Sequence, residues 1–204
     1  MWRNKLARTL ALSLAAAAAL VLTPPFSAPA SAGAVMTGFI EGDVIKIKTT
    51  WGGGYVLNIG GTSGSFEPGV RTKIHWNSSW DNQNRFQVWG PWGEDGLTWH
   101  MMMNRWSGLC LAVDRTDHTA NVIQDHCNIW DNKQWWAGQW NGTVAKLRNL
   151  DHHRAGFSNV LRQDTFNQVV GAPVFIGPVV TTATFRQEWI VHSCLFNGAE
   201  QKDC

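Results

Sequence analysis

The sequence has little charge, and tyrosine is almost missing from it. Charged residues make up 16% of its 204 residues, and a single tyrosine accompanies 13 tryptophans. Its most apolar stretch, near the N-terminus, is shorter than the roughly 20 residues that a membrane-spanning helix needs. Long helical periodicity is missing beyond that stretch. These absences argue against a helical protein and against a membrane span.

Motifs typical of enzymes and metal sites are missing too. The sequence has no Gly-x-Ser-x-Gly nucleophile elbow, no Gly-Lys-Ser/Thr phosphate-binding motif and no Cys-x-x-Cys zinc motif. Its acidic residues are scattered rather than paired as in glycoside hydrolases. His152 and His153 would point to opposite sides of a strand, so we expect a solvated turn there rather than a metal site. We therefore expect no catalytic activity and no cofactor.

The N-terminus has the pattern of a secretory signal peptide. Three basic residues precede an alanine-rich stretch, Leu10–Leu22, and Ala30-Ser31-Ala32 is a small-residue cleavage site. We expect residues 1–32 to be removed, which predicts a secreted, extracellular protein, and the alanine-rich leader is typical of bacteria. The leader carries three of 17 basic residues and none of 15 acidic ones, so the mature net charge is 14 − 15 = −1. That charge does not favour nucleic-acid binding.

Four cysteines follow the leader: Cys110, Cys127, Cys194 and Cys204. An even number in an exported chain predicts two disulfides. Of the three pairings that four cysteines allow, we favour Cys110–Cys127 and Cys194–Cys204 because each pair is local in the sequence. Closing loops of this size would stabilise the fold by about 3 kcal/mol each.

The same three-part pattern occurs three times along the chain. Each copy has a strand-like run, then an apolar triplet with a central leucine, and then two polar residues followed by an aromatic residue. The triplets are Val56-Leu57-Asn58, Cys110-Leu111-Ala112 and Val160-Leu161-Arg162, and the closing segments are Asn84-Arg85-Phe86, Lys133-Gln134-Trp135 and Gln187-Glu188-Trp189. The leucines are 54 and 50 residues apart (57 to 111, 111 to 161), and the closing aromatic residues 49 and 54 (86 to 135, 135 to 189). Such a period indicates a repeat architecture.

Short alternating runs predict the strands of these copies. Residues 44–49, 97–102 and 144–148 alternate apolar and polar side chains, and glycine-rich turns separate the strands. Three copies predict an all-β barrel with threefold symmetry, with the central leucines and closing aromatic residues inside. The expected organisation is an extension (33–43), a domain (44–191) of three repeats (about 44–92, 97–140 and 144–191), and a disulfide-tied tail (192–204).

The second copy resembles the ricin-type β-trefoil lectin domain. The segment Asn104–Val113, followed by Cys127 and Asn132-Lys133-Gln134-Trp135, is similar to that family's Asn-x-x-Ser-Gly-Lys-Cys-Leu-Asp-Val, cysteine and Asn-Gln-x-Trp pattern. The third copy ends in a complete Gln-x-Trp, and the resemblance covers about residues 40–191. It implies a ricin B-like β-trefoil and a carbohydrate-binding module without catalytic activity.

The resemblance also implies where a sugar would bind. Family sites use a triplet aspartate for sugar hydroxyls, an aromatic residue that stacks on the sugar, and an asparagine near the closing segment. Here Asn58, Ala112 and Arg162 replace the three aspartates. The candidate residues are Asn58, His75, Trp76, Asn82 and Gln83 in the first copy and Asp125, Trp130 and Asn132 in the second, whereas the third offers Arg162 and Phe175.

The expected partner is an extracellular glycan, with a protein partner chain as the alternative. The chain also resembles the trefoil subunits of the cytolethal distending toxins, which would imply that it holds a toxic partner and binds a cell surface. A trefoil protease inhibitor is a further alternative, although no exposed loop carries an obvious specificity residue held by a disulfide.

Overall fold

The computed structural model describes residues 38–50, 54–59, 66–77, 82–163, 169–181, 186–196 and 199–200. The predicted signal peptide and Cys204 lie outside the described residues. The strands are β1 (Val44–Thr49), β2 (Tyr55–Ile59), β3 (Thr72–Trp76), β4 (Phe86–Glu94), β5 (Leu97–Asn104), β6 (Cys110–Val113), β7 (Ala120–Asp125), β8 (Trp135–Asn141), β9 (Val144–Asn149), β10 (Asn159–Gln163), β11 (Val174–Pro178), β12 (Trp189–Ser193), β13 (Leu195–Phe196) and β14 (Ala199–Glu200). The helical segments are the 3-10 turns η1 (Asn82–Asn84) and η2 (Asn132–Gln134) and the short helix α1 (Leu150–Arg154).

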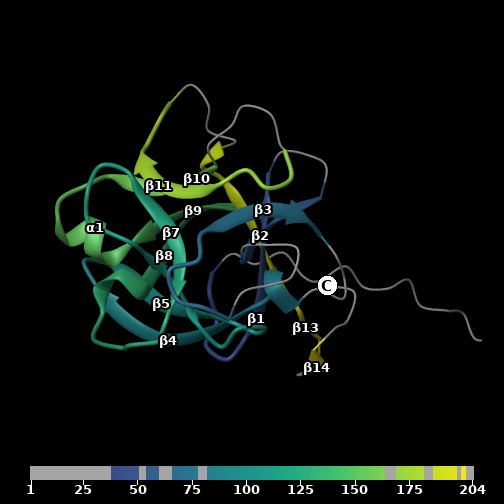
Figure 1. Cartoon of the computed structure of the whole chain (residues 1–204). Helices are drawn as coiled ribbons and strands as arrows, with labels where there is room; N and C mark the ends of the chain where they lie inside the picture. Colours follow the sequence, from purple (N-terminus) through teal and green to yellow (C-terminus); the bar gives the residue numbers. More distant parts are fainter. Residues whose placement is uncertain are drawn as a thin grey trace, which may run out of the picture.

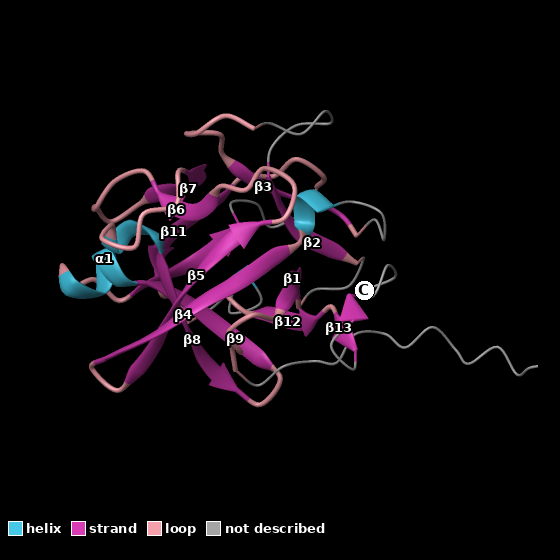
Figure 2. Ribbon diagram, turned by 90° about the horizontal axis from the view of Figure 1, so that it is seen from below, coloured by secondary structure: helices cyan, strands magenta, loops and turns pink. Residues whose placement is uncertain are grey.

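Six of these strands close into a barrel. Strand β1 pairs with β4, β4 with β5, β5 with β8, β8 with β9, β9 with β12, and β12 again with β1, all antiparallel. The ring leaves none of these six strands at an open sheet edge. Figure 2 shows the strands crossing one another at a steep angle, as strands of a barrel do.

Three hairpins cover the barrel. They are β2–β3, β6–β7 and β10–β11. Strand β11 pairs with β7, and single bridges join Arg71 to Ile123 and Lys73 to Pro173. The three hairpins therefore meet one another, one from each repeat, and Figure 1 shows β3, β7 and β11 on the same side of the molecule. A six-stranded barrel with a cap of three hairpins is the β-trefoil architecture, which confirms the predicted fold.

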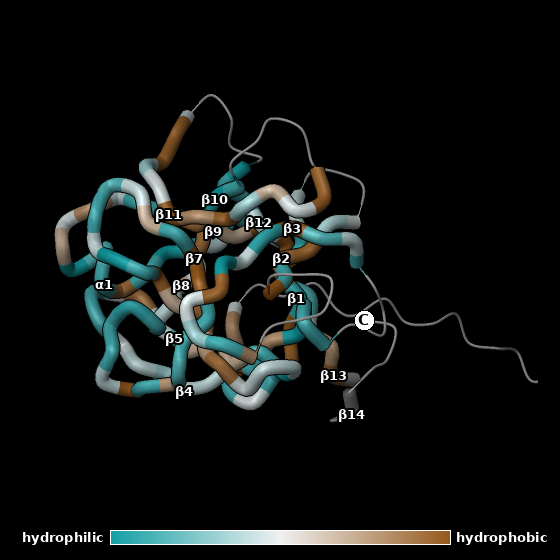
Figure 3. Tube along the Cα trace, viewed as in Figure 1, coloured by the Kyte–Doolittle hydropathy of each residue, from teal (hydrophilic) through white to brown (hydrophobic). Residues whose placement is uncertain are grey.

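The core follows the alternation of the strands. Leu57, Leu111 and Leu161, the central leucines of the three triplets, are all fully buried in one apolar cluster. Figure 3 shows apolar and polar residues alternating along the strands. Lys46 departs from this pattern, because it is fully buried although it lies among the polar positions of β1. Its ammonium group donates a 2.8 Å hydrogen bond to Oδ1 of Asn77, which offsets part of the cost of burying the charge.

The structure corrects the closing aromatic residue of the second copy. Trp136, rather than Trp135, is fully buried in the barrel core, and its indole N–H donates to the carbonyl of Leu111 at 2.9 Å. Trp189 makes the matching 3.0 Å bond to the carbonyl of Leu161 in the third copy. Trp135 packs in a separate cluster, because consecutive strand residues point to opposite sides. The closing residues are therefore 50 and 53 apart (86 to 136, 136 to 189).

The predicted solvated turn at His152 and His153 is wrong. Both residues lie in α1, and His152 is fully buried, with Nε2 2.9 Å from the carbonyl oxygen of Asp117. His153 is half-buried, and its Nε2 lies 3.1 Å from Oδ2 of Asp95. In the part of the chain that the structure describes, no group of three potential ligands could hold a metal ion. The same part contains no helix long and apolar enough to cross a membrane.

One of the two predicted disulfides is present. Cys110 and Cys127 are bonded, which ties β6 to the loop after β7. Cys194 is fully buried beside Val44. Because Cys204 lies outside the described residues, the second bridge stays a prediction.

Candidate carbohydrate-binding site

The loop between β7 and β8, residues 126–131, is fastened to the barrel at several points. The disulfide fixes Cys127, and the buried side chain of Gln134 holds the loop on both sides of that residue. Gln134 donates from Nε2 to the carbonyl of His126 at 2.7 Å and accepts at Oε1 from the backbone N–H of Asn128 at 2.8 Å. This is the structural use of the glutamine in the Gln-x-Trp segment. Gln187 makes the matching pair of bonds, at 3.1 Å each, to Pro178 and Val180 in the third copy.

Further bonds fix the tip of the 126–131 loop. Asn128 accepts at Oδ1 from the backbone N–H of Trp130 at 3.0 Å, and the indole N–H of Trp135 donates to the carbonyl of Ile129 at 3.1 Å. Asp131 caps η2 by accepting from the backbone N–H of Lys133 at 3.0 Å. The loop is therefore held in one shape by its own side chains and by the barrel, as binding loops on rigid scaffolds are.

This fastened loop presents an indole to solvent. Trp130 is 80% exposed, more than the other large apolar residues that are exposed in the described structure, and Ile129 beside it is 58% exposed. An exposed indole on a rigid loop, next to a second exposed apolar residue, offers a surface that a ligand or partner can cover. The family resemblance named Trp130 as a candidate stacking residue, and Ile129 beside it was not predicted.

Polar residues that could bind hydroxyls stand at the two ends of the loop that carries the indole. Asp125 ends β7 and is half-buried, and its Oδ1 accepts from the backbone N–H of His126 at 2.7 Å. Asn132 begins η2 and is also half-buried. An aromatic face with carboxylate and amide groups beside it is the combination that recognises a sugar, because the ring covers C–H groups while the polar groups bind hydroxyls. All three predicted second-copy residues therefore lie on or directly beside one rigid loop.

The first-copy candidates are divided between the two faces of the β2–β3 hairpin. Tyr55 lies opposite Trp76, and Val56 opposite His75, so Trp76 and His75 point to opposite sides. Trp76 is 53% exposed, and its ring stacks on that of Tyr55 at 4.5 Å between centroids. Asn58 shares the face of His75 but is only 1% exposed, so its amide does not reach the surface. The predicted first-copy group of Asn58, His75 and Trp76 is not assembled in the described structure.

The remaining first-copy candidates lie in η1. Asn82 is exposed and Gln83 is half-buried, and the backbone carbonyl of Gln83 accepts from the side chain of Asn104 at 2.9 Å. Residues 78–81, which include Trp80, lie outside the described residues. Among the described residues of β2 and β3, neither Tyr55 nor Trp76 faces the side of Asn58 and His75.

The second and third triplets do not supply a sugar-binding acid. Ala112 is buried. Arg162 is used internally, because its guanidinium lies 5.1 Å from the centroid of the Phe175 ring and donates from Nη1 to the carbonyl of Pro178 at 3.3 Å. The third-copy candidates thus contact each other across β10 and β11.

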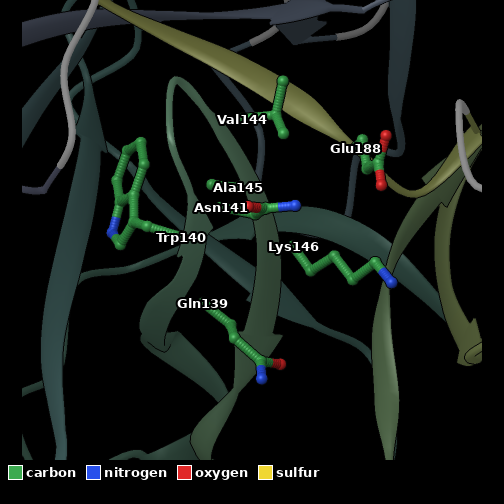
Figure 4. Close-up of a pocket in the computed structure, with 7 residues that line it drawn as sticks. All are labelled: Gln139, Trp140, Asn141, Val144, Ala145, Lys146 and Glu188. Atoms are coloured by element: carbon green, nitrogen blue, oxygen red, sulfur yellow. The ribbon is translucent and has the colours of Figure 1, made fainter.

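A small pocket lies on the β8–β9 hairpin (Figure 4). Its volume is about 170 Å³, and its polar lining includes Gln139, Asn141, Lys146 and Glu188. The indole of Trp140 projects from the opposite side of the strand to Gln139, as strand alternation requires. Trp140 also lines the pocket, so the pocket combines polar groups with part of an indole.

An apolar pocket of about 240 Å³ adjoins the 126–131 loop. It lies between β4, β5 and the disulfide and is lined by Trp89, Met101, Met103, Ile129 and Trp135 together with Gly90 and the two cysteines. Trp89 is 50% exposed. The sequence patterns did not indicate this pocket, because it combines Cys110 and Trp135 of the second copy with Trp89, Met101 and Met103 of β4 and β5, which no repeat motif marks.

Comparison with known proteins identifies the fold. No protein-family model matches the chain, and no curated protein sequence does. A designed threefold-symmetric protein, ThreeFoil, superimposes with a TM-score of 0.60 at 20% identity, over 73% of this chain and 97% of that one. The chain is a β-trefoil. The trefoil is also similar to the Macrolepiota procera ricin B-like lectin in complex with lactose, with a TM-score of 0.58 at 13% identity, over 76% of this chain and 99% of that one.

A toxin subunit shares the trefoil as well. A chain of the Haemophilus ducreyi cytolethal distending toxin superimposes with a TM-score of 0.57 at 10% identity, over 77% of this chain and 87% of that one. At these identities the likeness concerns the fold, and the same fold serves different functions. The function must therefore be argued from the site.

Proposed function

We propose that the protein is a lectin-like module that binds extracellular carbohydrate through the 126–131 loop. The observation that carries the proposal is the 80% exposed indole of Trp130 on a loop fixed by a disulfide and by Gln134. Trp130 stacks on the apolar face of a sugar, and Asp125 and Asn132 bind its hydroxyl groups. The ricin B-like lectins that share the fold support this reading.

A site of this kind is shallow, so its affinity for one sugar is low. One stacked ring contributes about 1 kcal/mol beyond its buried area, and polar groups at the surface exchange water for sugar with little net gain. Useful affinity then requires several sites on one target or a linked partner. The module is secreted, as its leader predicts, and it acts by binding rather than by catalysis.

The test is a glycan array with the mature, oxidised chain and two single-tryptophan variants. Trp130→Ala should weaken binding about tenfold or more, because it removes the stacking surface. Trp76→Ala is the matched control, because Trp76 is also an exposed tryptophan but belongs to the first copy. Loss of binding in Trp76→Ala alone would move the site to the first copy. Absence of any glycan binding by the unmodified chain would refute the lectin proposal.

A second function has one observation in its favour. The apolar pocket beside the loop, with exposed Trp89 and Ile129 at its rim, has the aromatic character of a protein-binding hot spot. The likeness to the toxin chain supports a role as the binding subunit of a multi-chain assembly. Co-purification of a specific second chain that Trp89→Ala abolishes, without glycan binding, would favour this function over the first.

A further inference from the structure

The apolar pocket of about 240 Å³ is built on the outer face of the barrel wall. In the antiparallel pairing, Met101 of β5 lies directly opposite Trp89 of β4 on one side and Trp135 of β8 on the other. Met103, two residues further along β5, lies opposite Cys110 of β6. Residues that lie directly opposite each other point to the same face, so these five side chains share one surface.

The other face of the same wall is the barrel core. Met102, which lies between the two methionines of the pocket, is fully buried in the core cluster, and so is Trp136 beside Trp135. Strand alternation thus divides three consecutive methionines between the core and the pocket. The pocket therefore lies outside the barrel core, and a ligand bound there would contact one set of methionines and not the other.

Solvent reaches the pocket at its rim. Trp89 and Ile129 are exposed, and Met103 is half-buried. Met101 and Trp135 are buried and form the deeper part of the lining. The lining therefore runs from exposed walls to a buried floor, so a ligand can enter from solvent.

Gly90 makes room for this floor. Its φ is +96°, and a Cβ there would lie only 2.9 Å from Cζ3 of Trp135. The glycine sits where the β4–β5 register shifts between Trp89 and Trp92, and it lets the indole of Trp135 lie against the β4 backbone. A side chain at this position would displace that ring, so the shape of the pocket depends on the glycine.

The lining offers little to a polar ligand. Among the described residues that line the pocket, none has a charged, hydroxyl or amide side chain. The indoles of Trp89 and Trp135 carry N–H groups, and that of Trp135 already donates to the carbonyl of Ile129 at 3.1 Å. The two cysteines are bonded to each other. A sugar, whose hydroxyl groups need partners, is therefore poorly suited to this pocket, whereas an uncharged apolar ligand suits it well.

The size and the atoms of the lining favour one aromatic ring. A water molecule needs about two to four polar partners, which these walls do not supply. Indole faces and the thioethers of Met101 and Met103 make favourable contacts with aromatic rings. An apolar cavity of about 150 Å³ is large enough for benzene, so a pocket of about 240 Å³ can hold a six-membered ring with a small substituent.

We propose that this pocket binds a small, uncharged aromatic molecule with one six-membered ring. The ring packs against the indoles of Trp89 and Trp135 and against the thioethers of the two methionines. A free molecule suits the pocket better than an aromatic side chain of a partner protein, because that side chain would bring peptide N–H and C=O groups to the apolar rim at Trp89 and Ile129. The proposal does not depend on sugar binding by the 126–131 loop.

The test follows the methionine methyl resonances in NMR spectra while the mature, oxidised chain is titrated with benzene. An aromatic ring shifts the resonances of methyl groups close to it. Those of Met101 and Met103 should therefore move with one-to-one saturation, while that of Met102 in the core stays unchanged. Pyrazine has the shape of benzene but two ring nitrogens that need hydrogen-bond donors, so it should bind at least about tenfold more weakly.

Two tryptophan variants complete the test. Trp89→Ala removes one wall and should weaken benzene binding at least about fivefold. Trp76→Ala is the matched control, because Trp76 is exposed to a similar degree but lies on the β2–β3 hairpin, and it should leave the affinity unchanged. No saturable shift, an equal shift of Met102, equal binding of pyrazine, or an unaltered affinity in Trp89→Ala would each overturn the proposal. A partner chain that binds through Trp89 and is not displaced by benzene would also overturn it and assign the pocket to a protein.

Discussion

Replacing Gln134 by alanine tests whether the rigidity of the 126–131 loop matters for binding. The change removes two hydrogen bonds, of 2.7 and 2.8 Å, that hold His126 and Asn128. It also leaves a space in the barrel wall, because Gln134 is buried. His126 and Asn128 are exposed, so their freed backbone groups can bond to water, and the loss is the net value of two hydrogen bonds at about 0.5–1.5 kcal/mol each. We therefore expect the free energy of unfolding to fall by about 1–3 kcal/mol. Urea denaturation measures this loss.

The matched control is Gln187→Ala. Gln187 is equally buried and makes the same pair of bonds in the third copy, to Pro178 and Val180. Its loss should lower stability by a similar amount. Its loop does not carry Trp130, so glycan affinity should be retained in Gln187→Ala and reduced at least about tenfold in Gln134→Ala, measured well below the unfolding transition.

Two results would refute this reasoning. Equal loss of glycan affinity in both variants would show that general destabilisation, rather than the loop, controls binding. A change in unfolding free energy below about 0.5 kcal/mol in Gln134→Ala would show that the two hydrogen bonds do not hold the loop, since that is the scale of ordinary surface substitutions.

Two further predictions concern stability. Replacing Cys110 and Cys127 together by serine should lower the free energy of unfolding by about 3 kcal/mol, as measured by urea denaturation. A reducing agent should not destabilise the variant further through this bridge. An unchanged urea midpoint in the variant would contradict the prediction. Burial lowers the pKa of both His100 and His152 from 6.5, so the unfolded chain binds protons first as pH falls. The free energy of unfolding should therefore decrease as the pH falls below about 6.5 toward the folded-state pKa values. A free energy of unfolding that stays constant or rises between about pH 7.5 and about 5.5 would contradict this prediction.

The repeats of the fold could be predicted from the sequence because they are set by local patterns. The leucines of the triplets, such as Leu57, lie inside because strand alternation fixes which side they take. The same alternation explains the error at Trp135. Trp135 and Trp136 are adjacent, and either could be the closing aromatic residue of the second copy. A shift of one residue along a strand moves a side chain to the opposite face of the barrel wall. The burial of Trp136 in the barrel core and its bond to Leu111 decide between them.

The candidate site could be predicted only where its residues are close in sequence. Asp125, Trp130 and Asn132 follow one another along one loop, so their neighbourhood does not depend on packing between distant strands. Trp76 and Asn58 belong to different strands, β3 and β2. Whether their side chains lie on the same face of the hairpin depends on the pairing register of the two strands, which the sequence pattern does not specify. Trp89 and Ile129 are 40 residues apart (89 to 129), and only the folded barrel brings them to one pocket.

The pairing of β1 with β12 has a consequence for how the chain acquires its structure. Ile45 lies opposite Ser193, 148 residues later (45 to 193), so the barrel wall cannot close until nearly the whole domain has been synthesised. Such distant contacts slow folding, because the intervening chain must be ordered before they form. If the predicted leader directs export, this delay would be useful. A chain that cannot complete its barrel during synthesis would stay unfolded long enough to pass through a membrane pore, and it would close the barrel and oxidise Cys110 and Cys127 on the far side.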